Sequence, residues 1–384
     1  MVWPDERPRA PLSSAEAFAR LRLLRSPRVG AVTYYHLLAS HGSAAAALDA
    51  LPALAMQGGA GRGGAAYRPA DPARIRAEMD ALDAMGGRYL FHDDPHYPDL
   101  LAQMEGAPPI LSLLGEGALL DQPGVAIVGA RNASAAAMRL AREFAAALVA
   151  QGYAVVSGMA RGVDAAAHRG ALLPGTAAQG GGTIGVIGGG LDKPYPPENI
   201  DLHGVMAREG LLVAEMPMGT EPQARHFPRR NRIIAGLCAG TVVVEAAPGS
   251  GSLITARLAG EVGREVMAIP GSPLDSRAHG CNQLIRDGAI LVQTPADVIE
   301  LIESFTGTPR STFREPAHGL SPVFVPPADE GPADIEPLLG VAPIAVDELV
   351  RQSGASPGAV QLALLELELA GRLIRHAGGR VSLG

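Results

Sequence analysis

The sequence predicts a multidomain α/β protein with a small helical N-terminal domain, a core built on a parallel sheet, and a C-terminal winged helix. Three observations predict it. Apolar residues recur at helical spacing over 1–85, short β-rich runs alternate with loops and helices over 86–305, and a helix–turn–helix–hairpin pattern occupies 331–384. A chain of 384 residues, 47% of them hydrophobic, is long enough to bury several cores.

The N-terminal zone, 1–85, is predicted to be helical because its apolar and Ala/Arg-rich segments repeat with the period of a helix. Ser26-Pro27 and Gly42 interrupt these segments, and the run Gly58–Gly64 is expected to be a loop. Helices are expected at Ala15–Leu24, Val32–Ala39 and Ala44–Leu51.

The central zone, 86–305, is predicted to be a parallel sheet with helices on both faces. Polar or Gly-rich loop residues and then a plausible helix follow each of the first five β-rich runs, which is the pattern of such a sheet. Its ligands bind beyond the carboxyl ends of the strands, so functional residues are expected in the loops that follow. The runs are Val125–Val128, Tyr153–Val156, Thr183–Ile187, Leu211–Ala214, Val242–Val244 and Glu265–Ile269.

The C-terminal zone is predicted to be a winged helix-turn-helix, preceded by a Pro-, Ser- and Thr-rich linker over 306–330. Helices fit Val346–Gln352 and Pro357–Ala370, and a hairpin fits Arg372–Leu383, turning at Gly378-Gly379. The second helix occupies the position of a recognition helix, but it carries Glu366 and Glu368 and no Lys or Arg. Since duplex binding relies on cations that meet phosphates, a protein-contact or modulatory role is favoured.

Charge and cysteine content limit the possible partners and compartments. The net charge is −7, but six acidic residues lie between Pro326 and Val350, so the remainder is close to neutral and a local basic site can still bind nucleic acid. No run approaches the ~20 apolar residues of a membrane span, and the start, MVWPDERPRAP, lacks a secretory signal pattern. Two cysteines, Cys238 and Cys281, exclude a disulfide framework or four-cysteine metal site, so a reduced, cytoplasmic compartment is expected.

The loops after the first two strands offer groups that suit a phosphate. Gly129-Ala130-Arg131-Asn132 lacks the G-x-G-x-x-G dinucleotide pattern, but it places Arg131 and backbone amides at a helix start; an ordinary turn with a surface arginine fits equally well. In the next loop, Gly158 permits close backbone approach, and Ser157 and Arg161 are donors. Asp164 and His168, four residues apart, could form a metal or acid–base pair, but structural hydrogen bonding is favoured.

The loops after the third and fourth strands combine cations with aromatic or helix-terminal positions. Prolines stiffen the loop that carries Lys193 and Tyr195, so that the ring could stack on a base while the amine meets a phosphate; alternatively, Tyr195 packs the loop onto the sheet. The segment Arg225–Arg232 concentrates arginines at a helix start, which is unfavourable unless an anion binds there. Replacing Arg229 and Arg230 by Glu is expected to abolish strand binding and leave the fold intact.

The loop after the fifth strand opens a helix with Ser250, Gly251, Ser252 and Thr255, which form an anion-binding nest without the lysine of a Walker A sequence. Tight binding of a nucleoside triphosphate with Mg²⁺ is therefore not supported. Gly280-Cys281-Asn282 follows the sixth strand. All these loops are expected at one edge of the sheet.

From Val125 to about Val292 the chain resembles the DprA/Smf family nearly loop by loop. The shared stretches, in the family's order, are VAIVGARNAS, VVSGMARGVDAAAHRGAL, GGGLDKPYPPEN, FPRRNRIIAG, VVVEAAPGSGSLITARLA and IPGSPLDSRAHGCNQLIRDGA. The resemblance implies an extended Rossmann-like domain that binds single-stranded DNA in a basic pocket, dimerises, and loads the RecA recombinase onto incoming strands in natural transformation. The helical N-terminal zone resembles the family's SAM-like domain, and the winged helix resembles an accessory module of some members.

The resemblance also implies a set of pocket residues. The loop Gly271–Arg277 and the insertion-like Thr176–Gly182 are less typical of the family. The residues implied by the resemblance are Arg131, Ser157, Gly158, Lys193, Asn199, Arg229, Arg230, Ser250, Gly251, Ser252 and Asn282. The donors and the aromatic ring found in these loops add Arg161, Tyr195, Asn231 and Thr255 to the candidate DNA-binding residues.

The sequence favours a binding protein over an enzyme, since it offers no nucleophile–base pair, metal cluster or Walker motif; no cofactor and no metal are expected. The alternative is a Rossmann-like nucleotide phosphoribohydrolase of the lysine-decarboxylase-like kind. Glu245 and Ser250–Thr255 imitate the layout of such enzymes, but Pro248–Ser252 matches the expected P-G-G-x-G-T loop only in part.

Overall fold

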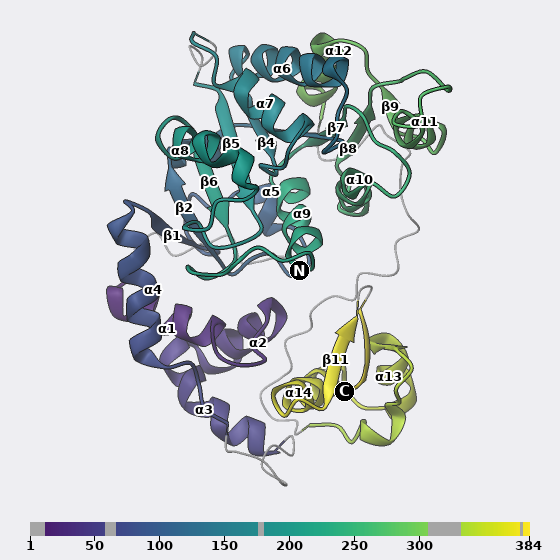
Figure 1. The fold of residues 1–384 in the computed structure, drawn as a ribbon. Helices are drawn as coiled ribbons and strands as arrows, with labels where there is room; N and C mark the ends of the chain where they lie inside the picture. The colour runs from purple at the N-terminus through teal and green to yellow at the C-terminus, as the bar shows by residue number, and fades with distance from the viewer. Residues whose placement is uncertain (1–11, 58–66, 176–179, 306–331, 377–378) are drawn as a thin grey trace. The chain divides into compact units, whose positions relative to one another are not determined.

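The computed structural model describes residues 12–57, 67–175, 180–305, 332–376 and 379–384 (Figure 1). The chain divides into two compact units. One combines Met1–Met79 with Ala317–Gly384, and the other is Asp80–Pro316. The predicted linker at 306–330, the Gly58–Gly64 loop and most of Thr176–Gly182 lie outside the described residues.

The larger unit is built on a nine-stranded sheet with the order β1-β2-β6-β5-β4-β3-β7-β8-β9. The strands from β6 to β9 in this order are parallel, and β1 and β2 join antiparallel beside β6. The six predicted strands are confirmed, whereas β1, β2 and β9 were not predicted. The strands are β1 (Arg88–Phe91), β2 (Ile110–Gly115), β3 (Gly124–Val128), β4 (Ala154–Ser157), β5 (Gly182–Ile187), β6 (Leu211–Ala214), β7 (Gly240–Val243), β8 (Glu265–Ala268) and β9 (Ile290–Leu291).

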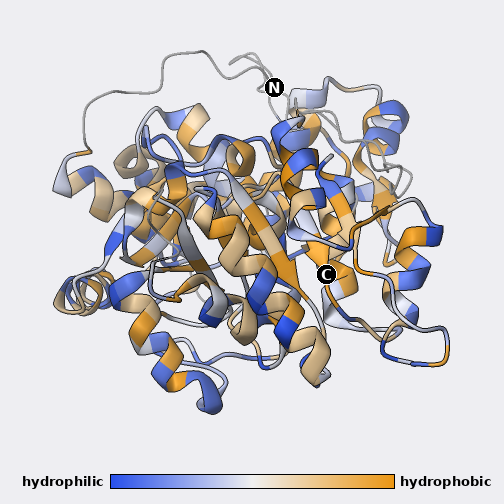
Figure 2. Cartoon of the chain, turned by 90° about the horizontal axis from the view of Figure 1, so that it is seen from above, coloured by the Kyte–Doolittle hydropathy of each residue, from blue (hydrophilic) through white to orange (hydrophobic). Residues whose placement is uncertain are grey.

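Helices cover both faces of this sheet, as predicted. Alternate residues of a strand point to opposite faces, so Val125 and Ile127 pack with α6, α7 and α12, while Ala126 and Val128 pack with α9, α10 and α11. Both faces are therefore apolar along the central strands (Figure 2). The helices are α5 (Asp99–Ala102), α6 (Ala135–Ala150), α7 (Val163–Ala171), α8 (Ile200–Glu209), α9 (His226–Gly236), α10 (Gly251–Glu261), α11 (His279–Arg286) and α12 (Pro295–Glu303), with short 3-10 turns at Gly117–Asp121 and Pro197–Asn199.

The strand order places a topological switch point at β3. From β3 the chain adds β4, β5 and β6 on one side of it, then crosses over to add β7, β8 and β9 on the other. The loops after β3 and β7 consequently leave the sheet in opposite directions, and open α/β sheets bind their ligands in the crevice between such loops.

The other unit contains the N-terminal helices and the winged helix. The three predicted N-terminal helices are confirmed with somewhat longer bounds, and α4, which was not predicted, follows them and continues into the larger unit. The predicted helix–turn–helix and the two strands of the wing are confirmed, whereas Gly378 of the predicted turn lies outside the described residues. Gly354 ends the first helix with a φ of 63°. These elements are α1 (Ser14–Leu24), α2 (Ala31–His41), α3 (Ala44–Gln57), α4 (Pro72–Ala84), β10 (Ile344–Ala345), α13 (Val346–Ser353), α14 (Pro357–Leu369), β11 (Leu373–His376) and β12 (Arg380–Leu383), with a 3-10 turn at Glu336–Leu338.

Within the described ranges, none of the helices has the length and apolar content that a membrane crossing requires.

Candidate nucleic-acid interface

A pocket of about 200 Å³ opens at the carboxyl ends of β3, β4 and β5. Its wall combines cations and aromatic rings with bare backbone from Gly158 to Ala160. The loops after the three strands and the first turns of α9 supply these groups, as expected for a parallel sheet. Of the predicted residues, the pocket brings together Arg131, Gly158, Arg161, Tyr195 and Arg230.

Phe227, at the start of α9, is the aromatic centre of this pocket and was not predicted. Its ring centroid lies 5.6 Å from that of Tyr195, with the planes tilted by 33°. The guanidinium carbons of Arg131 and Arg230 lie 5.3 and 5.9 Å from the centroid of Phe227. Cations at these distances are attracted by the negative face of an aromatic ring. The signal in the sequence was an aromatic residue within a run of arginines.

Arg230 is a buried cation with a fixed position. It is 6% exposed, and its Nη1 donates to the carbonyl oxygen of Val186 at 2.9 Å. A Cβ on Gly158 would lie 1.9 Å from the same Nη1, so only glycine fits there. Burial lowers the pKa of Arg230 to about 10, with Asp164 opposing the shift, so Arg230 stays charged at neutral pH. The side chain therefore holds a positive charge at a fixed position in the pocket wall.

Asp164 organises the loop that faces Arg230. Its Oδ2 accepts hydrogen bonds from the backbone N–H groups of Gly158, at 3.1 Å, and Ala160, at 3.3 Å. Burial raises the pKa of this carboxyl, and the Arg230 charge and the two backbone donors act in the opposite direction. His168 bonds instead to Thr183. The predicted structural hydrogen bonds are thus present at both residues. Among the described residues, no group of potential metal ligands occurs.

Three other cations near the pocket each face a carboxylate of the same chain. Lys193 Nζ lies 3.0 Å from Glu221, Arg161 lies 3.3 Å from Glu198, and the 55% exposed Arg229 lies 3.2 Å from Glu215. The hydrogen bond to Glu221 raises the pKa of Lys193. Glu215 also accepts from Arg232 at 2.5 Å. A phosphate that binds at these positions has to compete with an internal carboxylate.

Ser157 and Asn199 support the pocket from behind and do not line it. The Ser157 hydroxyl is buried and donates to the Ile127 carbonyl oxygen at 2.6 Å. The Asn199 Nδ2 donates to the carbonyl oxygens of Met159 and Ala160 at 2.9 and 3.2 Å. Met159 has a φ of 59°, which a non-glycine residue adopts only when its surroundings hold it there. Both predicted side chains therefore fix the shape of the loop.

The remaining predicted residues form a second group around the N-terminus of α10. Ser250 caps the helix through the Ser252 N–H at 3.4 Å, and Thr255 is buried one turn further on. The Asn231 Nδ2 donates to the carbonyl oxygen of Gly251 at 3.3 Å. Asn282 closes the following loop by bonding to both N and O of Gly271. None of them lines the pocket, so α9 separates the two groups: Arg230 faces one and Asn231 contacts the other.

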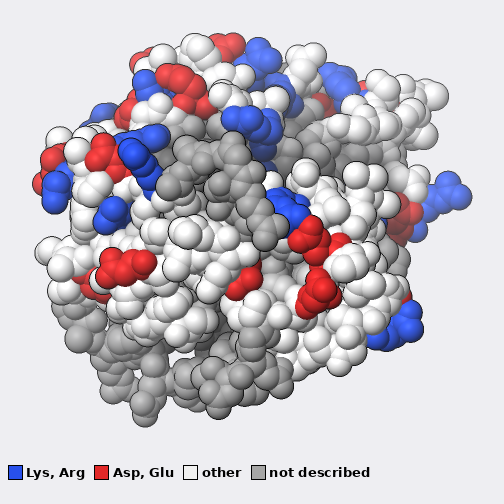
Figure 3. All heavy atoms as spheres, turned by 90° about the horizontal axis from the view of Figure 1, so that it is seen from below, with Lys and Arg blue, Asp and Glu red and all other residues white. Residues whose placement is uncertain are grey.

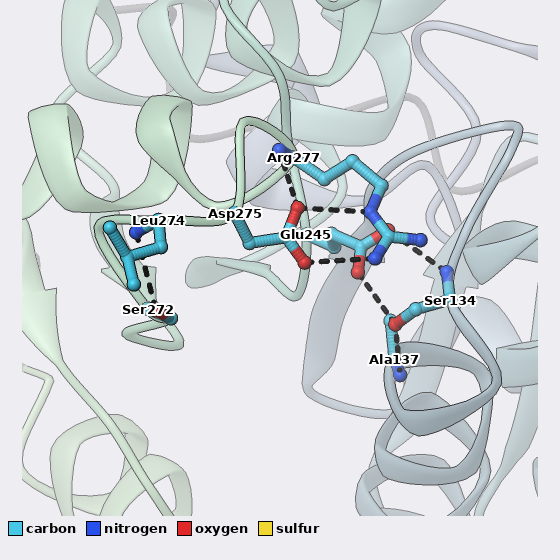
Figure 4. A network of polar contacts seen from close by, with 7 residues as sticks. All are labelled: Ser134, Ala137, Glu245, Ser272, Leu274, Asp275 and Arg277. Atoms are coloured by element: carbon cyan, nitrogen blue, oxygen red, sulfur yellow. Dashed lines mark hydrogen bonds and ion pairs between the residues drawn. The ribbon is translucent and has the colours of Figure 1, made fainter.

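Glu245, two residues after the end of β7, lies beside Ser134 at the N-terminus of α6 (Figure 4). Its carboxylate accepts from the N–H and the hydroxyl of Ser134 at 3.0 and 2.6 Å, and the Ser134 hydroxyl caps α6 through the Ala137 N–H. Arg277, held by both carboxylate oxygens of Asp275, lies beside it. The N-terminus of α6 therefore already has its negative partner, and Glu245 is committed to a cap.

Replacing Arg230 by Glu is expected to destabilise the fold, whereas the sequence alone suggested that the double substitution would leave it intact. The site is almost fully buried beside Asp164, so the substitution would place two carboxylates together out of water. Of these two neighbours, Arg229 is the one exposed enough for a charge reversal that tests binding.

Family models match the central, N-terminal and C-terminal parts of the chain. The model of the family described as DNA recombination-mediator protein A matches residues 88–303. A DprA-like N-terminal HHH domain matches 14–81, and a DprA winged helix domain matches 324–379.

Curated relatives and solved structures match as well. Protein Smf of Synechocystis is 37% identical over 76% of this chain and 79% of its own length. DNA processing protein DprA of Streptococcus pneumoniae is 44% identical over 55% of this chain and 72% of its own length. The X-ray structure of the pneumococcal DprA has a TM-score of 0.60 at 34% identity, covering 76% of this chain and 98% of that one. A structure of DprA from Helicobacter pylori, solved in a study of its single-stranded DNA binding mode, also matches. It has a TM-score of 0.51 at 27% identity and covers 57% of this chain and 97% of that one. By its sequence, its domains and its fold, this chain belongs to the DprA/Smf family.

Proposed function

We propose that this chain binds single-stranded DNA at the pocket between β3, β4, β5 and α9, and acts by binding and not by turnover. The observation that carries the proposal is the ring pair of Phe227 and Tyr195 set among Arg131, Arg161 and Arg230. Aromatic faces stack on unpaired bases and guanidinium groups meet phosphates, which is how single strands are held. A duplex keeps its bases stacked and paired, so it cannot place one in such a pocket.

The role we propose is that of a recombination mediator, which protects incoming single strands and loads the RecA recombinase onto them in natural transformation. The family description supports the mediator role, and the Helicobacter protein of the same fold binds single-stranded DNA. RecA as a partner, a homodimer through the Rossmann-like domain and a cytoplasmic location extend this proposal from the family resemblance.

Substitution of Phe227 tests the site. Phe227→Ala removes the stacking face and is expected to weaken binding of a labelled single strand by about 1–3 kcal/mol, about fivefold to a hundredfold. Phe227→Tyr keeps the ring and serves as the matched control, with an affinity near that of the original protein. Anisotropy titrations and thermal melting of both variants provide the readout. If a folded Phe227→Ala protein bound the single strand as tightly as the original protein, the pocket would not be the binding site.

The alternative, nucleotide phosphoribohydrolase activity, is not favoured, because the buried carboxylate of Glu245 already accepts two hydrogen bonds from Ser134. Incubation with nucleoside monophosphates should release no free base. Release that is lost in a Glu245→Gln variant would establish the enzyme instead.

A further inference from the structure

Helix α14 of the winged helix is apolar on two faces. One face packs into the winged-helix core with α13 and the wing, through residues spaced i, i+3, i+4 and i+7. The other face, at i, i+3 and i+7, packs with α1, α2 and α3 of the N-terminal helical domain. The first set is Val360, Ala363, Leu364 and Leu367, and the second is Leu362, Leu365 and Leu369. A surface helix needs one apolar stripe; two stripes indicate a helix between two partners.

Polar contacts fix α14 on the same N-terminal helices. The Thr33 hydroxyl, on α2, donates to Glu368 at 2.9 Å, and Arg375 of the wing donates to the same carboxylate oxygen at 3.0 Å. Arg28 Nη1 donates to the carbonyl oxygen of Leu369 at 2.7 Å, where a helix C-terminus favours a cation. A Cβ on Gly371 would lie 2.5 Å from the Arg28 guanidinium carbon, so glycine permits this approach.

The covered face is the one a DNA reader would need. In a winged helix-turn-helix the second helix enters the major groove and presents the side away from its own core. Here Leu365 is 5% exposed and Leu369 is fully buried on that side, and α14 carries no Lys or Arg. A helix that displayed these leucines to a duplex would offer phosphates no cation and would expose apolar surface.

We propose that the winged helix is a docking module for the N-terminal helical domain of its own chain, with α14 as the docking surface, and not a reader of duplex DNA. The leucine face, the Thr33–Glu368 contact and the Arg28 cap together make up the interface. The module thus ties residues from the two ends of the sequence into one unit.

The test is a double substitution in the full-length protein. Leu365→Asp with Leu369→Asp disrupts the docking face but leaves the winged-helix core residues untouched. Ile374→Asp, at a 49% exposed position on the wing, is the control. Hydrogen–deuterium exchange of α2 and α3 should become about tenfold faster or more in the leucine variant, since it loses the burial of two leucine side chains. The control should not change it.

Duplex binding is measured on the same proteins, and the original and leucine-variant proteins should bind equally weakly. Unchanged exchange in α2 and α3, or a duplex affinity that falls with the leucine substitutions, would overturn the proposal. Exchange protection that depends on protein concentration would also overturn it, because the interface would then join two copies. If the leucine variant unfolds the winged helix, Thr33→Val and Arg28→Ala decide: faster exchange in α2 and in the last turn of α14 supports docking, and no change refutes it.

Discussion

Arg229 and Arg230 are neighbours in the sequence and have opposite environments. Arg229 is 55% exposed and faces Glu215, whereas Arg230 is 6% exposed and bonds to Val186. Arg229→Glu should therefore fold normally and weaken single-strand binding. Arg230→Glu should destabilise the protein by about 3–5 kcal/mol, since it breaks a buried charge arrangement. Thermal melting separates the two effects, and similar melting temperatures for both variants would contradict the burial of Arg230.

The internal carboxylates of the interface should limit its affinity. Glu198 and Glu221 are 58% and 70% exposed and pair with Arg161 and Lys193, cations that a phosphate would also use. Exposed pairs contribute about 0.2–1 kcal/mol, so Glu198→Gln and Glu221→Gln should each tighten single-strand binding by up to about fivefold.

Glu261→Gln is the matched control for these substitutions, because Glu261 pairs with Arg257 at the far end of α10. Anisotropy at low salt measures all three proteins. Weaker binding in Glu198→Gln and Glu221→Gln would show that these carboxylates support the site.

His168 links α7 to the sheet. The Thr183 hydroxyl of β5 donates to Val155 of β4, so it accepts from His168 Nδ1, which must carry the proton. Nε2 is buried without a hydrogen-bond partner. Burial, with Arg230 and Arg169 nearby, lowers the pKa of His168 to about 3. The helix is therefore attached to the sheet by a histidine that folding keeps neutral.

This attachment predicts an acid-dependent loss of stability. Below about pH 6.5 the unfolded chain takes up a proton at His168, whereas the folded chain does not. The contribution of His168 to the free energy of unfolding is therefore fully present above that pH and is lost as the pH falls toward 3. The slope from this residue is up to about 1.4 kcal/mol per pH unit. His168→Gln should flatten the dependence of the unfolding free energy on pH by that amount; an unchanged slope in denaturant titrations would contradict the assignment.

The elements that the sequence predicts well are those whose pattern is local. The six parallel strands are short, apolar and followed by loop residues, and all six are present. β1 and β2 pair antiparallel at the edge of the sheet and lack the alternation of strand, loop and helix, and β9 has only two residues. No sequence periodicity therefore predicts these three strands. The apolar spacing that gives α14 its two faces is present in the sequence. The partners of these faces come from opposite ends of the chain, so local pattern alone does not identify them.

The candidate site was predictable in its chemistry and not in its geometry. The sequence located the loops, and the pocket contains Arg131, Gly158, Arg161, Tyr195 and Arg230 from them. It could not show that Ser157 and Asn199 turn to the backbone, or that Phe227 turns inward, because these orientations depend on side chains from other loops.

For the whole molecule, the net charge of −7 means that no broad positive field attracts a polyanion. On the face drawn in Figure 3, the described basic and acidic side chains are interspersed. Affinity for DNA should then come from a few fixed groups and from base stacking. That combination favours a strand with unpaired bases over a duplex.

The most direct test is fluorescence anisotropy of labelled single-stranded and duplex oligonucleotides of equal length, titrated with the full-length protein over a salt series. Tighter binding of the single strand is expected at every salt concentration. Its affinity should fall as salt rises, with a log–log slope of about 0.7 for each phosphate contact. Equal affinity for both oligonucleotides, or no binding to either at low salt, would contradict this expectation.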